Sequence, residues 1–94
     1  MAIKNFKDKE AQRIFKGRFS TKLPQQIQRK ARRRLVQLHA AIALEDLKLP
    51  KSNHLEQLHG DRKSQHSIRI NNQYRVCFIW NDGNVVDVEI VDYH

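Results

Sequence analysis

The sequence predicts an α+β domain with the element order β-α-α-β-β-β, in which two main helices pack on a small antiparallel sheet. Two observations support this fold class. Apolar residues recur at helical spacing over residues 25–43, whereas they alternate at strand spacing in several segments after residue 53. The chain has 94 residues, which suits one domain. We therefore expect residues 1–94 to form a single domain that carries its functional site on the surface.

The first half contains a short strand and the helices. Residues 3–6 read as the strand, and residues 8–16 read as a short helix. Residues 25–43 form the longer helix, which begins directly after Pro24. Its apolar residues recur every three or four positions and make one stripe, Ile27, Ala31, Leu35, Leu38 and Ile42. A short continuation over residues 44–50 completes this half.

The second half changes to the period of strands. Four segments alternate apolar and polar residues and read as strands: residues 54–58, 65–70, 74–80 and 85–93. Asn71-Asn72 and Asp82-Gly83 mark turns between the last three. Matching apolar residues across neighbouring strands predicts the register, with the pairs Ile70–Tyr74, Ile68–Val76, Val76–Ile90 and Phe78–Val88.

This register places charged residues together on the face away from the helices. Arg69 lies opposite Arg75, and Tyr93 lies diagonally from Arg75 on the same face. Two arginines in such positions repel each other, so either an anion lies between them or both extend into solvent. Asp92 points to the other face, where we expect a supporting role.

Basic residues are concentrated in the first half. Residues 1–50 hold 13 Lys and Arg against 4 Asp and Glu, a net charge of +9, whereas residues 51–94 hold 5 against 6, a net charge of −1. Five of six successive positions in the long helix are basic: Arg29, Lys30, Arg32, Arg33 and Arg34. This cluster favours RNA, bound through its phosphates without reading of sequence. An ordinary solvated helix face is the alternative.

The composition argues against several classes of protein. Cys77 is the only cysteine, so no internal disulfide can form, and we expect it to be a small buried residue. No apolar run has transmembrane length and the N-terminus lacks a signal peptide's hydrophobic region, so we expect a soluble cytoplasmic protein. The five histidines lack metal-ligand spacing, and we expect neither a metal nor a cofactor. His66 is expected to pack on the apolar face.

The segment LEQLHGDRKSQHSIRINNQYRVCFIW and the ending VEIVDYH contain the motifs L-x-G-D-R, S-I-x-I, Q-Y-R and D-Y-H. In combination these resemble the HigB-type toxins of bacterial toxin–antitoxin modules, which belong to the RelE/ParE superfamily and are also called plasmid-maintenance killer proteins. The resemblance covers nearly the whole chain. It implies the superfamily fold, two helices against a curved antiparallel sheet. It also implies a ribosome-dependent endoribonuclease that cuts mRNA in the decoding site and so inhibits translation.

The resemblance further implies a partner, a HigA-like antitoxin with a helix-turn-helix DNA-binding domain. The complex of the two proteins would repress its own promoter, so operator DNA would be bound only through that complex. The basic surface of the long helix would then suit either ribosomal RNA or an acidic segment of the antitoxin.

Individual residues carry over in part. The ending Asp92-Tyr93-His94 matches active-site residues of the HigB toxins, and Arg75 matches the arginine that follows the aromatic residue of the third strand. Some HigB toxins have a histidine and a lysine, three residues apart, before the Gly-Asp-Arg motif. In this chain His59 occupies the lysine position, and the histidine position falls near Glu56, with His54 as a nearby substitute.

Metal-independent cleavage of RNA needs a base for the 2′-OH, an acid for the leaving 5′-oxygen and cations for the phosphate. His59 and His94 are the candidates for the two proton transfers because histidine titrates near neutral pH. Tyr93 would relay a proton or stack on a base. The expected catalytic residues are His94, Tyr93, Asp92, His59 and Arg75, and the expected substrate-binding residues are Arg69, His54 and Arg62.

Two other functions fit the same sequence. A ParE-like toxin shares the superfamily fold but targets DNA gyrase and lacks the nuclease residues; SOS induction without mRNA cleavage would indicate this function. The other is a weakly active or inactive module that binds RNA or antitoxin, which the missing lysine favours. Absence of toxicity together with intact antitoxin binding would indicate that module.

Overall fold

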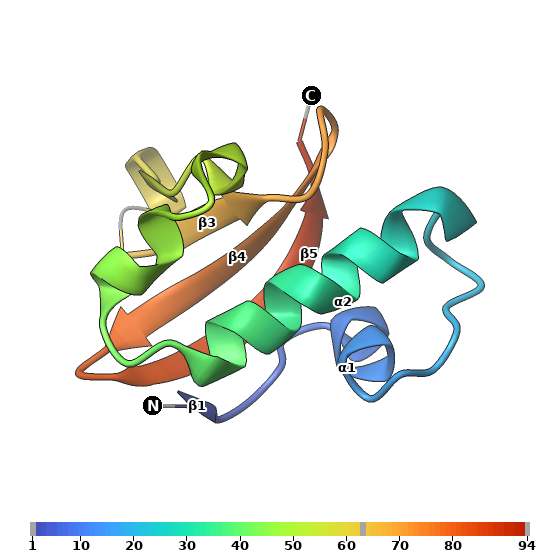
Figure 1. The fold of residues 1–94 in the computed structure, drawn as a ribbon, viewed down its shortest axis with the longest axis horizontal. Helices are drawn as coiled ribbons and strands as arrows, with labels where there is room; N and C mark the ends of the chain where they lie inside the picture. Colours follow the sequence, from blue (N-terminus) through green and yellow to red (C-terminus); the bar gives the residue numbers. More distant parts are fainter. Residues whose placement is uncertain (1, 63, 94) are drawn as a thin grey trace.

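The structure, a computed structural model, describes residues 2–62 and 64–93. Two helices pack on a five-stranded sheet of order β1-β5-β4-β3-β2 (Figure 1). The predicted α+β class is confirmed, with two differences. First, the sheet is mixed, because β1 (Ala2–Ile3) runs parallel to β5 (Asn84–Asp92), while the other neighbouring strands are antiparallel. Second, the order β-α-α-β-β-β has one strand fewer than the observed sheet, in which the predicted segment 54–58 contributes the short strand β2 (Glu56–Gln57).

Helix α1 (Lys9–Phe15) begins at a side-chain cap. The Asp8 carboxylate accepts a hydrogen bond from the Glu10 N–H at 2.9 Å, which satisfies one of the unpaired donors of the first turn. The helix then buries Ala11 and Ile14 against the rest of the molecule. None of the helices within the described residues is long and apolar enough to cross a membrane.

Helix α2 (Gln25–Ala40) begins after Pro24 as predicted but ends three residues before the predicted boundary. Because the chain leaves the helical path at Ala41, the predicted stripe is interrupted there. Ala41 is buried, whereas Ile42 is 78% exposed. The predicted continuation is a separate 3₁₀ helix, η1 (Leu44–Lys48), which buries Leu47.

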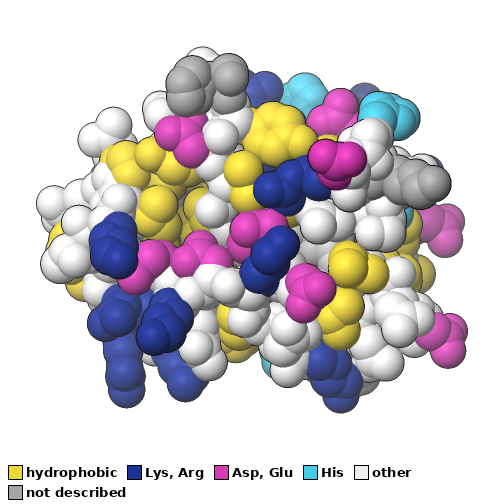
Figure 2. Space-filling model, turned by 180° about the vertical axis from the view of Figure 1, so that it is seen from behind, with side chains coloured by type: hydrophobic (Ala, Val, Ile, Leu, Met, Phe, Trp, Pro, Cys, Tyr) yellow, Lys and Arg dark blue, Asp and Glu magenta, His cyan; other side chains and the backbone are white. Residues whose placement is uncertain are grey.

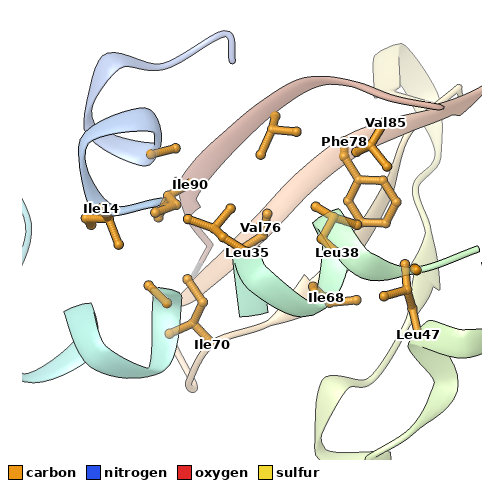
Figure 3. Close-up of a cluster of buried hydrophobic side chains, with 14 of the residues drawn as sticks. Ile14, Leu35, Leu38, Leu47, Ile68, Ile70, Val76, Phe78, Val85 and Ile90 are labelled. Atoms are coloured by element: carbon orange, nitrogen blue, oxygen red, sulfur yellow. The ribbon is translucent and has the colours of Figure 1, made fainter. Parts of the chain in front are cut away.

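The hydrophobic core lies between α2 and the sheet (Figure 3). The first four residues of the predicted stripe are all buried, and Leu35 and Leu38 point toward the strands. The sheet side contributes the residues predicted for this face, Ile68, Ile70, Val76, Phe78, Val88 and Ile90. Val85 is buried there as well, although strand alternation from Val88 places it on the opposite face. Each fully buried aliphatic or aromatic side chain contributes roughly 1.5 to 3 kcal/mol. A register slip of one residue would expose several of them and is therefore strongly disfavoured.

The register between β3 (His66–Arg69) and β4 (Tyr74–Asn81) is the predicted one, with Ile68 opposite Val76. The β4–β5 register also agrees up to Cys77, which lies opposite Glu89. Beyond that pair a β-bulge shifts the register by one residue, so the ladder resumes with Ile79 opposite Val86. The predicted pairing of Phe78 with Val88 falls inside this bulge, where the ladder is interrupted.

The bulge is accommodated by Asp87, which adopts a φ of 53°. Its carboxylate accepts a hydrogen bond from Asn5 Nδ2 at 2.8 Å, and its backbone N–H donates to Asn5 Oδ1 at 3.1 Å. The backbone N–H of Val88 donates to the Asn5 carbonyl at 3.3 Å. The bulge therefore joins β5 to the N-terminal segment, which places that segment at the edge of the sheet.

Candidate active site

The face of the sheet away from the helices carries the predicted pair of arginines. Arg69 and Arg75 lie directly opposite each other on β3 and β4. Both line a shallow hollow of about 260 Å³. The other lining residues are His54, Leu55 and Glu56, which precede or begin β2. The hollow therefore brings together three predicted site residues, Arg75, Arg69 and His54, and one carboxylate.

Among the described residues, the guanidinium of Arg75 contacts Ser67, His54 and Glu56. Nε donates to Ser67 Oγ at 2.7 Å, and Nη2 donates to the His54 carbonyl oxygen at 2.5 Å. Nη2 also lies 3.6 Å from Glu56 Oε1. The Arg75 side chain is only 13% exposed, so it does not extend into solvent. Its charge is instead paired with Glu56, a partner that neither of the two predicted arrangements included.

The backbone of His54 explains how its carbonyl reaches Arg75. His54 ends the 3₁₀ helix η2 (Lys51–Asn53) with a φ of 44°, in the left-handed region that non-glycine residues rarely adopt. This conformation is incompatible with a strand, so the predicted strand over residues 54–58 is reduced to β2. The imidazole of His54 is exposed at the edge of the hollow.

Arg62 lies on the same face but is occupied by protein contacts. Its Nη1 donates to Glu89 Oε2 at 3.1 Å and to Gln65 Oε1 at 3.0 Å. Lys7 Nζ lies 3.7 Å from the same Glu89 oxygen. The hydrogen bond to Glu89 is the main reason why the pKa of Arg62 lies above its usual value. Figure 2 shows the molecule from behind, where acidic and basic side chains lie interspersed.

Glu89 is a residue for which no role was predicted from the sequence. In the structure its side chain is only 15% exposed. Through Arg62 it ties the 3₁₀ helix η3 (Gly60–Arg62) to β5. Because η3 directly follows His59, this ion pair also restrains the position of a predicted catalytic residue.

Two titratable residues below this surface are structural. Cys77 is fully buried, and burial raises the pKa of its thiol to about 11, so the thiol is protonated and a poor nucleophile at neutral pH. His66 packs on Phe78 with ring centroids 6.2 Å apart, and burial lowers its pKa. The predictions of a small buried cysteine and a packed histidine are both confirmed.

The end of β5 is held by the loop between β3 and β4. Asp92 lies opposite Tyr74, and its Oδ2 accepts a hydrogen bond from Gln73 Nε2 at 3.2 Å. The backbone N–H of Tyr93 donates to the Gln73 carbonyl. Tyr93 is 36% exposed. The two bonds to Gln73 anchor Asp92 and Tyr93 to the loop. A strand end that carries site residues needs such an anchor to hold them in position.

Of the two histidines predicted for proton transfer, His59 and His94, the structure describes only His59. His59 is exposed, and its carbonyl accepts a hydrogen bond from the Arg62 N–H at 3.3 Å. His59 is not among the residues that line the hollow at Arg75. His94 lies outside the described residues. Within residues 2–62 and 64–93, no three or more His, Cys, Asp or Glu side chains form a group that could hold a metal ion.

The basic residues of α2 divide into three sets. Arg29, Arg32 and Arg33 line a groove of about 810 Å³ between α2 and the segment that follows α1. Lys30 lines a second hollow, of about 360 Å³, together with Arg69. Arg34 belongs to neither set.

Arg34 is buried, at 7% exposure, and does not belong to the exposed basic surface that was predicted for it. Its Nε donates to the Arg69 carbonyl at 2.9 Å, and its Nη2 donates to Ser52 Oγ at 3.2 Å. The reason is helical periodicity. Arg34 lies three residues after Ala31 and four before Leu38, so it shares their buried side of α2.

The matches of this chain to known proteins each cover most of its length. Residues 4–94 match a protein family described as the RelE-like toxin of the type II toxin–antitoxin system HigB. A protein of Vibrio cholerae serotype O1 named toxin HigB-1 is 40% identical over 79 residues, which cover 83% of each chain. An uncharacterized protein of Haemophilus influenzae is 30% identical over 82 residues, which cover 86% of this chain and 81% of that protein.

Proposed function

This chain belongs to the family of RelE-like HigB toxins of type II toxin–antitoxin systems, and we propose that it is an endoribonuclease that cleaves mRNA on the ribosome. The observation that carries the proposal is the hollow in which Arg69 and Arg75 face each other beside His54 and Glu56. Cleavage would take place in the cytoplasm, where it would stop translation. The chemistry requires no metal or cofactor, because side chains can supply each step.

The arginines suit a phosphate that gains charge in the transition state. Nε and Nη2 of Arg75 are held by Ser67 and by the His54 carbonyl, and Nε and Nη2 of Arg69 are held by Asn71 and Asn72. Among the described residues, Nη1 of either arginine has no hydrogen-bond partner. These anchored guanidinium groups would therefore donate to phosphate oxygens without reorganising, which is the condition for effective electrostatic stabilisation.

For proton transfer we propose that Glu56 takes the proton from the 2′-OH. Its carboxylate lies 3.6 Å from Arg75 Nη2, so a phosphate bound at Arg75 would bring the neighbouring ribose close to it. Glu56 also stands near the position at which some HigB toxins have a histidine. His94 would protonate the leaving 5′-oxygen, with His59 as the other candidate for proton transfer. Tyr93 would relay a proton or stack on a base, and Asp92 would hold the strand end.

The partner that we propose is a HigA-like antitoxin with a helix-turn-helix domain, through which the complex would bind operator DNA. The groove beside α2 suits an acidic amphipathic segment of such a protein. Phe19 and Val36 are 58% and 42% exposed at this groove, and both would gain from contact with apolar side chains. Arg29, Arg32 and Arg33 would pair with carboxylates. Loss of antitoxin binding in Phe19→Asp, with mRNA cleavage retained, would support this assignment.

The cleavage experiment uses purified ribosomes programmed with a defined mRNA and maps cut sites by primer extension. The wild-type chain should cut the ribosome-bound mRNA, and Arg75→Ala should cut it slower by a factor on the order of 10² to 10³. Lys48→Ala, a change at an exposed basic residue of η1, is the matched control and should cut at the wild-type rate. Thermal unfolding of each variant shows whether it is folded.

Several outcomes would contradict the proposal. If a folded Arg75→Ala variant cuts as fast as wild type, the hollow is not the active site. If the wild-type chain leaves mRNA intact and inhibits DNA gyrase, the chain is a ParE-like toxin. Glu56→Gln, His59→Gln and His54→Gln identify the base, since only loss of the true base should remove the fall in rate at low pH, where that base becomes protonated.

A further inference from the structure

A second hollow adjoins the candidate active site. It has a volume of about 360 Å³ and lies where α2, the η2 segment and the end of β3 meet. Arg69 lines both hollows, so the two are neighbours along one surface. The lining residues are Lys30, Ser52, Arg69, Ile70, Asn71 and Asn72. None of them is acidic.

The polar groups of this hollow are left mainly as hydrogen-bond donors. Ser52 Oγ accepts from Arg34 Nη2 at 3.2 Å, so its O–H remains to donate. Asn71 Oδ1 accepts from the Tyr74 N–H at 2.8 Å, and Asn72 Oδ1 accepts from Arg69 Nη2. The side-chain NH₂ groups of both asparagines therefore remain as donors. Together with the ammonium of Lys30, these donors form a lining that suits an anion. A cation, or a neutral ligand with few hydrogen-bond acceptors, would fit it poorly.

The charge around the hollow also favours an anion. Lys30 and Arg69 contribute to its lining, and the guanidinium of Arg34 lies behind it. In the part of the chain that the structure describes, none of these three residues forms an ion pair. Arg34 is buried and bonds a backbone carbonyl and a hydroxyl instead of a carboxylate, so its charge is desolvated without full compensation. Burial, followed by the neighbouring Arg33, lowers its pKa accordingly. An anion in the hollow would offset this cost.

We propose that this second hollow binds a phosphodiester group of single-stranded RNA adjacent to the phosphate that is cleaved. The inference rests on the proposed endoribonuclease function, because Arg69 then lies between two successive phosphates of one strand. Lys30 would supply the charge, and Ser52, Asn71 and Asn72 would supply hydrogen bonds to phosphate oxygens. Such contacts fix the register of the strand without reading its sequence.

Binding is tested by NMR on the isotope-labelled full chain, titrated with inorganic phosphate and with a trinucleotide whose 2′-O-methyl groups prevent cleavage. Both ligands should shift the amide signals of Ser52, Asn71 and Asn72. Lys30→Ala should weaken binding of both roughly fivefold, as expected for one lost phosphate contact. Lys9→Ala, a change at an exposed basic residue of α1, is the control and should leave these affinities unchanged.

Three results would overturn the subsite: signals that do not move, a Lys30→Ala variant that binds like wild type, or shifts with inorganic phosphate but not with the trinucleotide. The last would indicate a simple ion site. In cleavage assays Lys30→Ala should raise KM with kcat little changed, whereas Arg75→Ala should lower kcat. If the chain cuts no RNA but binds the trinucleotide through Lys30, the subsite stands and the proposed nuclease function fails. If Lys30→Ala cuts RNA with an unchanged KM, the proposed nuclease function stands and the subsite fails.

Discussion

Replacement of Arg34 by methionine should lower the free energy of unfolding by about 2 to 3 kcal/mol. The guanidinium makes two hydrogen bonds, at 2.9 Å to the Arg69 carbonyl and at 3.2 Å to Ser52 Oγ. A hydrogen bond that involves a charged group contributes about 1.5 to 3 kcal/mol, and the longer bond to the exposed Ser52 falls below this range. Methionine also removes a desolvated cation from the buried side of α2, which offsets part of the loss.

The assay is urea denaturation at neutral pH, with thermal unfolding as a second measurement. For a domain of this size a loss of 2 to 3 kcal/mol corresponds to a fall in Tm of about 8 to 24 °C. Arg33→Met is the matched control, since Arg33 is exposed and the change should cost less than about 0.5 kcal/mol. If Arg34→Met is as stable as Arg33→Met, the two hydrogen bonds do not hold α2 to β3. If it is more stable than wild type, desolvation of the cation outweighs those bonds and the guanidinium does not stabilise the fold.

Three further predictions concern the charged face and the residues below it. The pKa of Cys77 rises from 9.0 to about 11 on folding, so the unfolded state loses the thiol proton at lower pH than the folded state does. The free energy of unfolding should therefore fall by roughly 2 to 3 kcal/mol between pH 9 and 11. A Cys77→Ala variant should lack this part of the pH dependence. The pKa of His66 falls on folding, so the unfolded state binds the proton first. Stability should therefore decrease as the pH falls from neutrality through the folded pKa, and His66→Phe should show a smaller decrease in the same titration. Glu89→Gln removes the ion pair with Arg62, so amide hydrogen exchange in η3 should become faster, whereas Lys7→Ala, which breaks only the 3.7 Å contact of a 55% exposed side chain, should change it little.

Much of the candidate site followed from strand alternation. The register that pairs Ile68 with Val76 is decided by which residues must be buried, and it places Arg69 opposite Arg75 without any knowledge of the fold. The same register placed Ser67 on the face of the arginines, which was the available signal for its bond to Arg75. Glu56 was harder to identify, because β2 pairs with β3 through only two residues and its register cannot be read from so short a pattern.

Other features depend on segments that are distant in the sequence. The bulge at Asp87 forms because Asn5, 82 residues earlier, bonds both its carboxylate and its N–H. The parallel pairing of β1 likewise results from how the N-terminal segment meets the sheet edge. A short segment such as Ala2–Ile3 has no alternation from which pairing or direction could be predicted.

The sequence by itself determined the helices, three strands with most of their register, and the shared face of Arg69 and Arg75. Those properties follow from local periods of 3.6 and 2.0 residues, which burial enforces. Only the tertiary structure decided the charge partners: Glu56 for Arg75, Glu89 for Arg62, and a backbone carbonyl for Arg34. Residue type fixes the charge of a side chain, but its solvation and its partner depend on which distant segment covers it. For that reason one arginine of the basic helix lies in the fold while its neighbours remain at the surface.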